Sequence, residues 1–131
     1  MEISMNDKEL LELAKKARES AYAPYSCFTV GAALLGKSGR VYLGCNVENA
    51  ATPAGICAER TALVKAVSEG EKEFSAIAIV GGRAGQAEGI CPPCGICRQV
   101  LSEFCTGDFR IILAEDEVYP LEKLLPKSFS L

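Results

Sequence analysis

Three cysteines and one glutamate have the spacing of a catalytic metal site. Cys94 and Cys97 form a C-x-x-C pair, and Cys57 opens a second segment, Cys57-Ala58-Glu59. Two thiolates at this spacing can bind one zinc ion, and a third thiolate leaves the fourth tetrahedral position open to water. Glu59 lies two residues past Cys57, where it can reach that water without binding the metal and can carry protons. The expected chemistry is hydrolysis by a zinc-activated water.

Electrostatics set a condition on this site. Three thiolates on a dication leave a net negative centre, which opposes the acidification of bound water. Cys57 and Cys94 each open an expected helix, where the dipole favours negative charge and lowers the pKa of a thiol. Arg60 can donate hydrogen bonds to the thiolates. We expect these two features to offset the excess negative charge.

The composition narrows the function classes. The chain has no histidine, which excludes Ser-His and Cys-His hydrolases and leaves cysteine or carboxylate as zinc ligands. The seven cysteines are an odd count, and Met1–Leu10 lacks the apolar run of a signal peptide, which indicates reduced thiols. The net charge of -3 gives no reason to bind nucleic acid, and no apolar run could span a membrane. We therefore expect a cytoplasmic protein that binds neither nucleic acid nor a membrane.

Helices and strands alternate around these residues. Asn6 and Glu9 form a capping box before a helix that should end before Pro24. The other expected elements, in chain order, are strands Phe28–Leu35 and Arg40–Cys45 as a hairpin, helix Cys57–Glu69 with Gly70 as its cap, strand Ser75–Val80, helix Cys94–Cys105, strand Phe109–Ala114 and helix Leu121–Leu125.

This order predicts one α/β domain over residues 1–131. The two crossovers that flank Ser75–Val80 should make parallel, right-handed neighbours. The strand ends then bring the helix starts at Cys57 and Cys94 to one edge of the sheet, where open α/β sheets bind ligands. The loop 81–93 is rich in glycine and proline and has the length that often carries function.

The chain resembles the small, single-domain cytidine deaminases from about Tyr22 to Phe129. The segments that carry the resemblance are Tyr22–Ser26, Phe28–Leu34, Gly44–Ala50, Cys57–Ala62, Pro93–Val100 and Leu124–Pro126. Zinc deaminases include sites with three cysteine ligands and a glutamate that is not a ligand. The resemblance implies a three-layer α/β/α fold with a five-stranded mixed sheet in order 2-1-3-4-5, one Zn²⁺ per chain and, usually, a homotetramer with sites completed across subunits.

The resemblance also implies a reaction and residue roles. The reaction is the hydrolytic deamination of cytidine and 2′-deoxycytidine to uridine and 2′-deoxyuridine, with release of ammonia, in pyrimidine salvage. Asn46 and Glu48 match the pair that holds the ribose 3′-hydroxyl, and Phe28 matches the aromatic that packs on the pyrimidine. The Ala58 amide matches a donor to the base. Phe129 matches a C-terminal aromatic that reaches a neighbouring subunit's site.

Two positions depart from this family pattern. Thr52 stands where the family usually has a tyrosine, which removes a ring next to the sugar or at a subunit contact. Cys91 lies three residues before Cys94 and is either a spectator thiol or an alternative ligand. We favour the spectator, because Pro92-Pro93 stiffens the link and a fourth thiolate would close the reactive position.

Alternative functions remain open from the residues alone. A C-x-x-C pair also occurs in structural zinc modules and thiol redox proteins, although a redox role leaves Cys57 and Glu59 unexplained. A blasticidin-type deaminase shares the zinc motifs, but Glu48 favours a ribose. A polynucleotide editor is disfavoured by the small acidic chain. Taken singly, Phe28 is typical of a strand core and Phe129 of a frayed tail.

Overall fold

The computed structural model describes residues 5–131 as a five-stranded sheet with helices on both faces. Residues 1–4, which begin both the expected domain and the stretch Met1–Leu10, lie outside the described residues. The helices are α1 (Asp7–Arg18), α2 (Ala58–Ser68), α3 (Gly95–Phe104) and α4 (Leu121–Leu124), with a 3₁₀ turn η1 (Thr52–Ala54). The strands are β1 (Phe28–Gly36), β2 (Val41–Cys45), β3 (Phe74–Arg83), β4 (Arg110–Ala114) and β5 (Glu117–Pro120).

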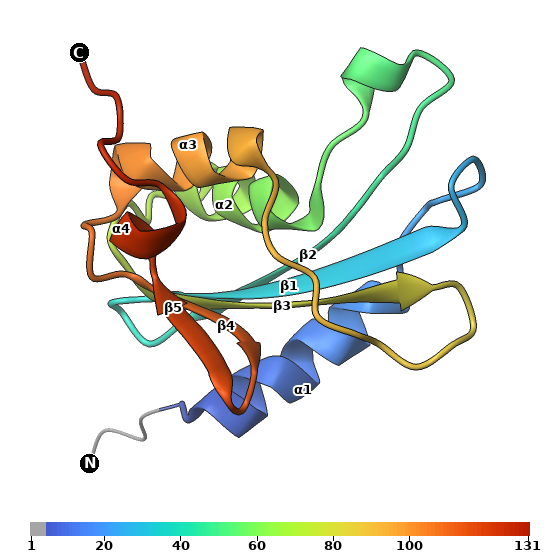
Figure 1. Cartoon of the computed structure of the whole chain (residues 1–131), viewed down its shortest axis with the longest axis horizontal. Coiled ribbons are helices and arrows are strands. Elements are labelled where there is room, and N and C mark those ends of the chain that lie inside the picture. Colours follow the sequence, from blue (N-terminus) through green and yellow to red (C-terminus); the bar gives the residue numbers. More distant parts are fainter. Residues whose placement is uncertain (1–4) are drawn as a thin grey trace.

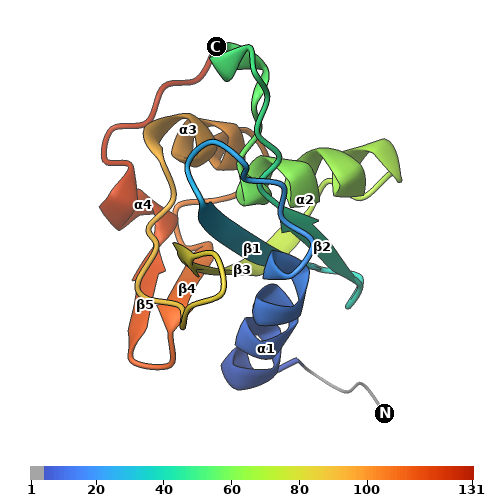
Figure 2. The ribbon, with the colours of Figure 1, turned by 90° about the vertical axis from the view of Figure 1, so that its right-hand side faces the viewer.

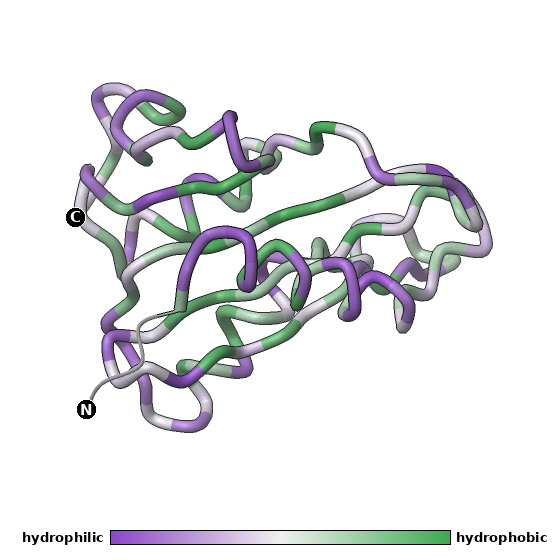
Figure 3. The backbone as a smooth tube through the Cα atoms, turned by 90° about the horizontal axis from the view of Figure 1, so that it is seen from below, coloured by the Kyte–Doolittle hydropathy of each residue, from purple (hydrophilic) through white to green (hydrophobic). Residues whose placement is uncertain are grey.

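The sheet order is β2-β1-β3-β4-β5, with α1 on one face and α2 and α3 on the other (Figure 1). This arrangement confirms the three-layer α/β/α fold and the strand order implied by the resemblance. Each face has its own apolar cluster: α1 packs on one side, and α2 and α3 pack on the other. In Figure 3 the backbone tube is coloured as hydrophobic mainly along its central stretches and as hydrophilic mainly at its outer turns.

The pairing of β3 corrects one prediction. β3 is parallel to β4 but antiparallel to β1, and β1 lies between β2 and β3. The expectation of parallel neighbours on both sides of Ser75–Val80 is therefore right for β4 and wrong for the hairpin side. The reason is that β1 is buried through its centre and pairs along both edges, as suits a central strand, whereas β2 is a short edge strand.

The end of α1 agrees with the sequence pattern, and the end of β3 does not. α1 ends at Arg18, before Pro24 as expected, and Tyr22 forms a bridge with the loop after β2: its N–H donates to Asn46 O at 3.0 Å. β3 extends to Arg83, so the loop that follows begins later than predicted. The expected caps are present: Asn6 Oδ1 accepts from the Glu9 N–H at 2.8 Å, and Gly70 has φ +98°.

Two glycines let helices rest directly on the sheet backbone. A Cβ on Gly44 would lie 2.5 Å from both Ala58 O and Ala62 N, in the first turns of α2. A Cβ on Gly31 would collide with the backbone of α1 at Ala14. The start of α2 is therefore fixed to β2 by backbone contact alone. None of the helices in residues 5–131 combines the length and apolar character that crossing a bilayer requires.

Candidate metal centre and active site

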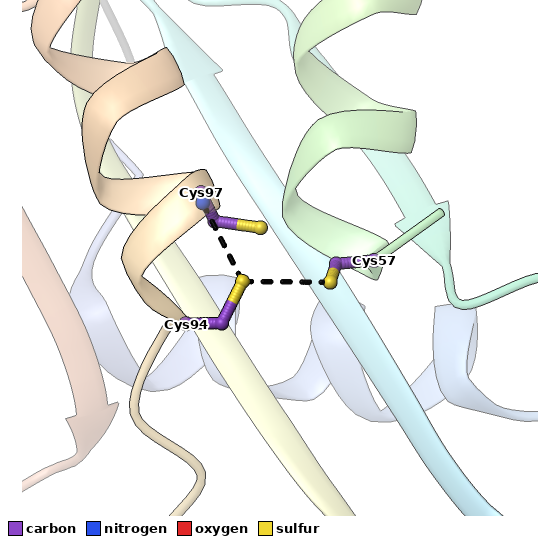
Figure 4. Close-up of side chains that lie close together, drawn as sticks. All are labelled: Cys57, Cys94 and Cys97. Atoms are coloured by element: carbon purple, nitrogen blue, oxygen red, sulfur yellow. Dashed lines mark hydrogen bonds between the residues drawn. The ribbon is translucent and has the colours of Figure 1, made fainter. Parts of the chain in front are cut away.

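Three thiols meet where α2 and α3 begin (Figure 4). Cys57 is the residue before α2, Cys94 is the cap of α3, and Cys97 lies in its first turn. Their sulfur atoms all lie within 4.8 Å of one another, and Cys57 Sγ and Cys94 Sγ are 3.7 Å apart. A tetrahedral zinc ion with Zn–S bonds of about 2.3 Å places its sulfurs about 3.8 Å apart, so the cluster fits this metal.

The acidity of these thiols also suits a cation. Hydrogen bonds from Cys97, and further ones from Arg60 and Cys94, lower the pKa of Cys57 to about 5. The hydrogen bond to Cys57 and then burial raise the pKa of Cys97. One thiol of the pair Cys57 and Cys97 therefore ionises readily, whereas ionisation of both thiols is opposed. A divalent cation between them removes that restriction, because ligand thiols bind metal as thiolates.

Arg60 lies against the thiols from the first turn of α2. Its Nη2 donates to Cys57 Sγ at 3.8 Å, and this hydrogen bond raises the pKa of the guanidinium. Within residues 5–131, Arg60 Nε is the buried side-chain nitrogen without a hydrogen-bond partner. The Arg60 guanidinium is a cation beside the sulfur of Cys57, and its Nε–H donor is still unused. It therefore provides the charge compensation that three thiolates require.

Glu59 is buried beside the same cluster. Glu59 is 4% exposed. Among the residues that the structure describes, it is the one charged residue that is buried. Burial raises the pKa of its carboxyl, and the charge of Cys57 adds to the effect. A carboxyl with a raised pKa is closer to neutrality at working pH, so it can both accept and release a proton.

A cavity of about 400 Å³ opens next to the thiols. The sequence-predicted residues in its wall are Asn46, Glu48, Cys57, Ala58, Glu59, Arg60 and Cys94. Its volume lies in the range of small-molecule pockets. Ala58 is the first residue of α2, so its N–H has no partner within the helix and is available to a ligand. The cavity therefore joins the thiol cluster, the buried carboxyl and a set of polar groups.

Asn46 and Glu48 line the cavity and also form hydrogen bonds with other parts of the chain. Asn46 accepts from Val30 N at 2.8 Å through Oδ1 and donates to Phe28 O at 2.9 Å through Nδ2, which leaves one Nδ2 hydrogen free. Glu48 accepts from the N–H groups of Tyr25 at 3.0 Å and Ser26 at 3.1 Å. The Ser26 hydroxyl also donates to it and, with these amides, lowers the pKa of the Glu48 carboxyl. Glu48 is therefore a charged acceptor at neutral pH.

Three expected residues lie outside the wall of this cavity: Cys97, which is buried behind it in the thiol cluster, Phe28 and Phe129. Phe28 is 40% exposed, and its ring lies near Gly81: a Cβ on that glycine would be 3.1 Å from Phe28 Cε1 and 2.8 Å from Cys91 Sγ. Phe129 is 67% exposed on the C-terminal segment, and its carbonyl accepts from Gln99 Nε2 at 3.2 Å. The structure of one chain thus does not bring Phe129 to the cavity of that chain.

The two unusual positions both line the cavity. Cys91 is in its wall but not in the thiol cluster, and burial raises the pKa of Cys91 to about 11. This placement supports a spectator thiol. Thr52 also lines the cavity, at the start of η1. Glu48, Thr52 and Gly55 also line a neighbouring hollow of about 310 Å³.

The residue-based analysis missed several contributors. Apolar side chains of the wall were given no role: Val30, Val47, Ile56 and Pro92. Arg98 was also missed; it donates to Pro93 O at 2.8 Å and to Leu124 O at 2.7 Å, and so holds the turn before Cys94 against α4. A signal for Arg98 existed, because it follows Cys94 by four residues, one turn along the same helix face.

The lowered pKa of Cys57 predicts selective alkylation. In protein stripped of metal by a chelator, iodoacetamide at pH 6.5 should label Cys57 before Cys91 or Cys105, whose pKa values are raised to about 11 and about 12. The thiolate is the reactive form and is populated above the pKa of each thiol. Peptide mass spectrometry against time gives the order. Added zinc should protect Cys57, and labelling of Cys105 first would contradict the assignment.

Comparisons with known proteins agree with this site. A family model described as the cytidine and deoxycytidylate deaminase zinc-binding region matches residues 4–113. A cytidine deaminase of Sporosarcina psychrophila is 48% identical over 130 residues, which cover 96% of this chain and 93% of the relative. One from Halalkalibacterium halodurans is 45% identical, with 96% of both chains covered.

Solved structures give the same result. The crystal structure of a cytidine deaminase from Burkholderia pseudomallei superposes with a TM-score of 0.86 and 45% identity, and covers 95% of this chain and 100% of that one. The cytidine deaminase of Mycobacterium tuberculosis gives a TM-score of 0.87 at 38% identity, with coverage of 98% and 100%. These matches confirm the predicted zinc cofactor and set aside a structural zinc module or a thiol redox protein. The chain belongs to the cytidine and deoxycytidylate deaminase family.

Proposed function

We propose that this chain hydrolyses cytidine and 2′-deoxycytidine to uridine and 2′-deoxyuridine, with release of ammonia. The observation that carries the proposal is the buried carboxyl of Glu59 in the wall of a nucleoside-sized cavity that it shares with Cys57 and Cys94. The relatives named cytidine deaminase support the choice of substrate. In the cell this reaction serves pyrimidine salvage in the cytoplasm.

The proton steps are assigned to Glu59. Cys57, Cys94 and Cys97 hold the zinc ion, which when bound supplies a water acidified toward neutral pH. Glu59 would take one proton from the attacking water as its oxygen bonds to C4 of the cytosine ring, and would deliver that proton to N3. It would then take the second proton from the same oxygen, as the C4 carbonyl forms, and pass it to the amino group, so that the C4–N bond breaks and ammonia leaves. Arg60 offsets the negative charge of the thiolates throughout.

The remaining polar groups orient the nucleoside. The free Nδ2 hydrogen of Asn46 and the Glu48 carboxylate hold the ribose 3′-hydroxyl. The N–H of Ala58 donates to the base, and Phe28, whose ring lies next to the cavity-lining Cys91 at Gly81, packs on the pyrimidine. These contacts fix C4 against the reacting water, which lowers the entropic part of the barrier.

Assembly completes the proposed site. A single domain over residues 1–131 forms a homotetramer in which Phe129, exposed and remote from its own cavity, reaches the site of a neighbouring subunit. The net charge of -3 gives no electrostatic reason to bind a nucleic-acid backbone, which favours the free nucleoside as substrate.

A direct assay tests the proposal. Purified, zinc-loaded protein should deplete the ultraviolet band of cytidine and release one ammonia per cytidine, because Glu59 and the thiol cluster share one cavity. A blasticidin-like cytosine nucleoside and a single-stranded RNA, assayed in parallel, should be poor substrates. Unchanged cytidine in protein with confirmed zinc would show that the site acts on a different substrate.

A further inference from the structure

Arg18 is charged but largely buried where the end of α1 packs on β1 and β3, and it lines a second hollow together with Thr29 and Glu88. It is the last residue of α1, and its side chain is 10% exposed. Two glycines make room for it. Gly31 lets the end of α1 rest on β1, and a Cβ on Gly82 would lie 2.9 Å from Arg18 Nη2. The guanidinium therefore occupies a slot between α1 and the sheet rather than solvent.

The guanidinium joins three separate segments. Its Nε donates to Thr29 O at 3.1 Å and to Thr29 Oγ1 at 2.8 Å, at the start of β1. Its Nη2 donates to Arg83 O at 2.8 Å, at the end of β3. Its Nη1 donates to Glu88 Oε2 at 3.2 Å, within the loop 84–93 that follows β3. Figure 2 views the molecule from the end at which α1 finishes and β1 begins.

Two of these segments lead into the wall of the cavity. Thr29 immediately precedes Val30, which lines the cavity. The loop 84–93 contributes Cys91 and Pro92 to the same wall and ends at Cys94. Backbone bonds also hold this loop: the Ala84 N–H donates to Cys27 O at 2.8 Å and the Gly89 N–H donates to Gly81 O at 2.8 Å. Arg18 adds the side-chain tie between the two wall segments.

Lys15 is a weaker second contact to the same loop. Its Nζ lies 3.3 Å from Glu88 Oε1, but the side chain is 41% exposed and also pairs with Glu12. It touches neither Thr29 nor Arg83 in the described hydrogen bonds. An exposed pair of this kind contributes little. Lys15 therefore serves as the matched control for Arg18.

We propose that Arg18 is a positioning residue that holds the loop 84–93 and the start of β1 at the separation that the cavity requires. Without its fork of donors, the loop keeps the Ala84 N–H to Cys27 O bond at its start but loses its tie to β1 at Glu88, and the cavity wall moves. Substrate binding weakens, whereas Glu59, fixed on α2, keeps its place beside the thiols. The kinetic part of this inference rests on the proposed deamination of cytidine.

Arg18→Met tests the proposal, because it removes the guanidinium and keeps the aliphatic stem. Exchange of the Gly89 amide, measured by NMR relative to the Ile79 amide in the core, should be about 10-fold faster than in wild type. KM for cytidine should rise on the order of 10-fold with kcat within about 2-fold. Lys15→Met should leave both unchanged. Leu13→Ala, which loosens the packing of α1, should lower Tm without raising KM.

The outcomes are distinct. An unchanged Gly89 exchange ratio or an unchanged KM in Arg18→Met overturns the positioning role, as does an equal KM rise in Leu13→Ala. If Arg18→Met does not fold, Glu88→Leu removes the acceptor on the loop that Arg18 and Lys15 share, and it should show the same faster Gly89 exchange while Lys15→Met does not. If wild type leaves cytidine unchanged, the proposed function fails while the exchange ratio still decides the role of Arg18.

Discussion

Glu59→Gln is expected to reduce kcat for cytidine by about 10³-fold or more while zinc stays bound, since general acid–base catalysis contributes roughly 10²–10⁴-fold and this residue serves two proton transfers. The amide keeps the shape of the side chain in its buried position but cannot accept a proton. Steady-state kinetics and zinc analysis on the same preparation measure the two effects together.

The control for this variant is Glu103→Gln, which makes the same change on an exposed residue of α3. It should retain wild-type kcat and zinc content. Activity retained in Glu59→Gln would contradict the proton-transfer role. Loss of zinc with activity would instead place Glu59 among the groups that hold the metal.

Cys94→Ala is expected to lose both the metal and the activity. Zinc should fall from one per chain to near zero, because two remaining thiolates bind the ion far more weakly than three. Zinc that binds only the folded state stabilises it, so Tm should also fall. A chelator should lower the Tm of wild type and leave that of Cys94→Ala almost unchanged.

Cys91→Ala separates the cluster from the neighbouring thiol. Cys91 lines the cavity but is not in the group of three sulfurs. This variant should therefore keep its zinc and its response to the chelator. Zinc loss in Cys91→Ala, or full zinc retention in Cys94→Ala, would show that a different set of thiols holds the ion.

The sequence was sufficient to find the thiol cluster and Glu59, because their spacing places both at helix starts. It did not reveal β5, a four-residue, half-buried edge strand without an apolar run, which came only from the family resemblance. The antiparallel pairing of β1 with β3 was missed because it depends on which edge of the hairpin is buried. Local pattern does not contain that information.

The hydrogen bonds that hold the polar residues of the cavity could not be predicted from the sequence either. Asn46 spends two of its hydrogen-bonding groups on β1, and Glu48 binds the Tyr25–Ser26 turn, through contacts that require the folded chain. Arg18 follows the same rule, since its partners at Thr29, Arg83 and Glu88 are far apart in sequence. Motifs locate the reacting groups, and tertiary contacts determine how they are supported.

The bare backbone contacts at Gly31 and Gly44 uncouple the site from the identity of the core. The distance from β2 to the first turn of α2 is set where no side chain intervenes, so volume-conserving exchanges among leucines and isoleucines elsewhere should leave Cys57 in place. The same feature gives a rule for redesign: the core can be repacked, provided that these two positions remain glycine.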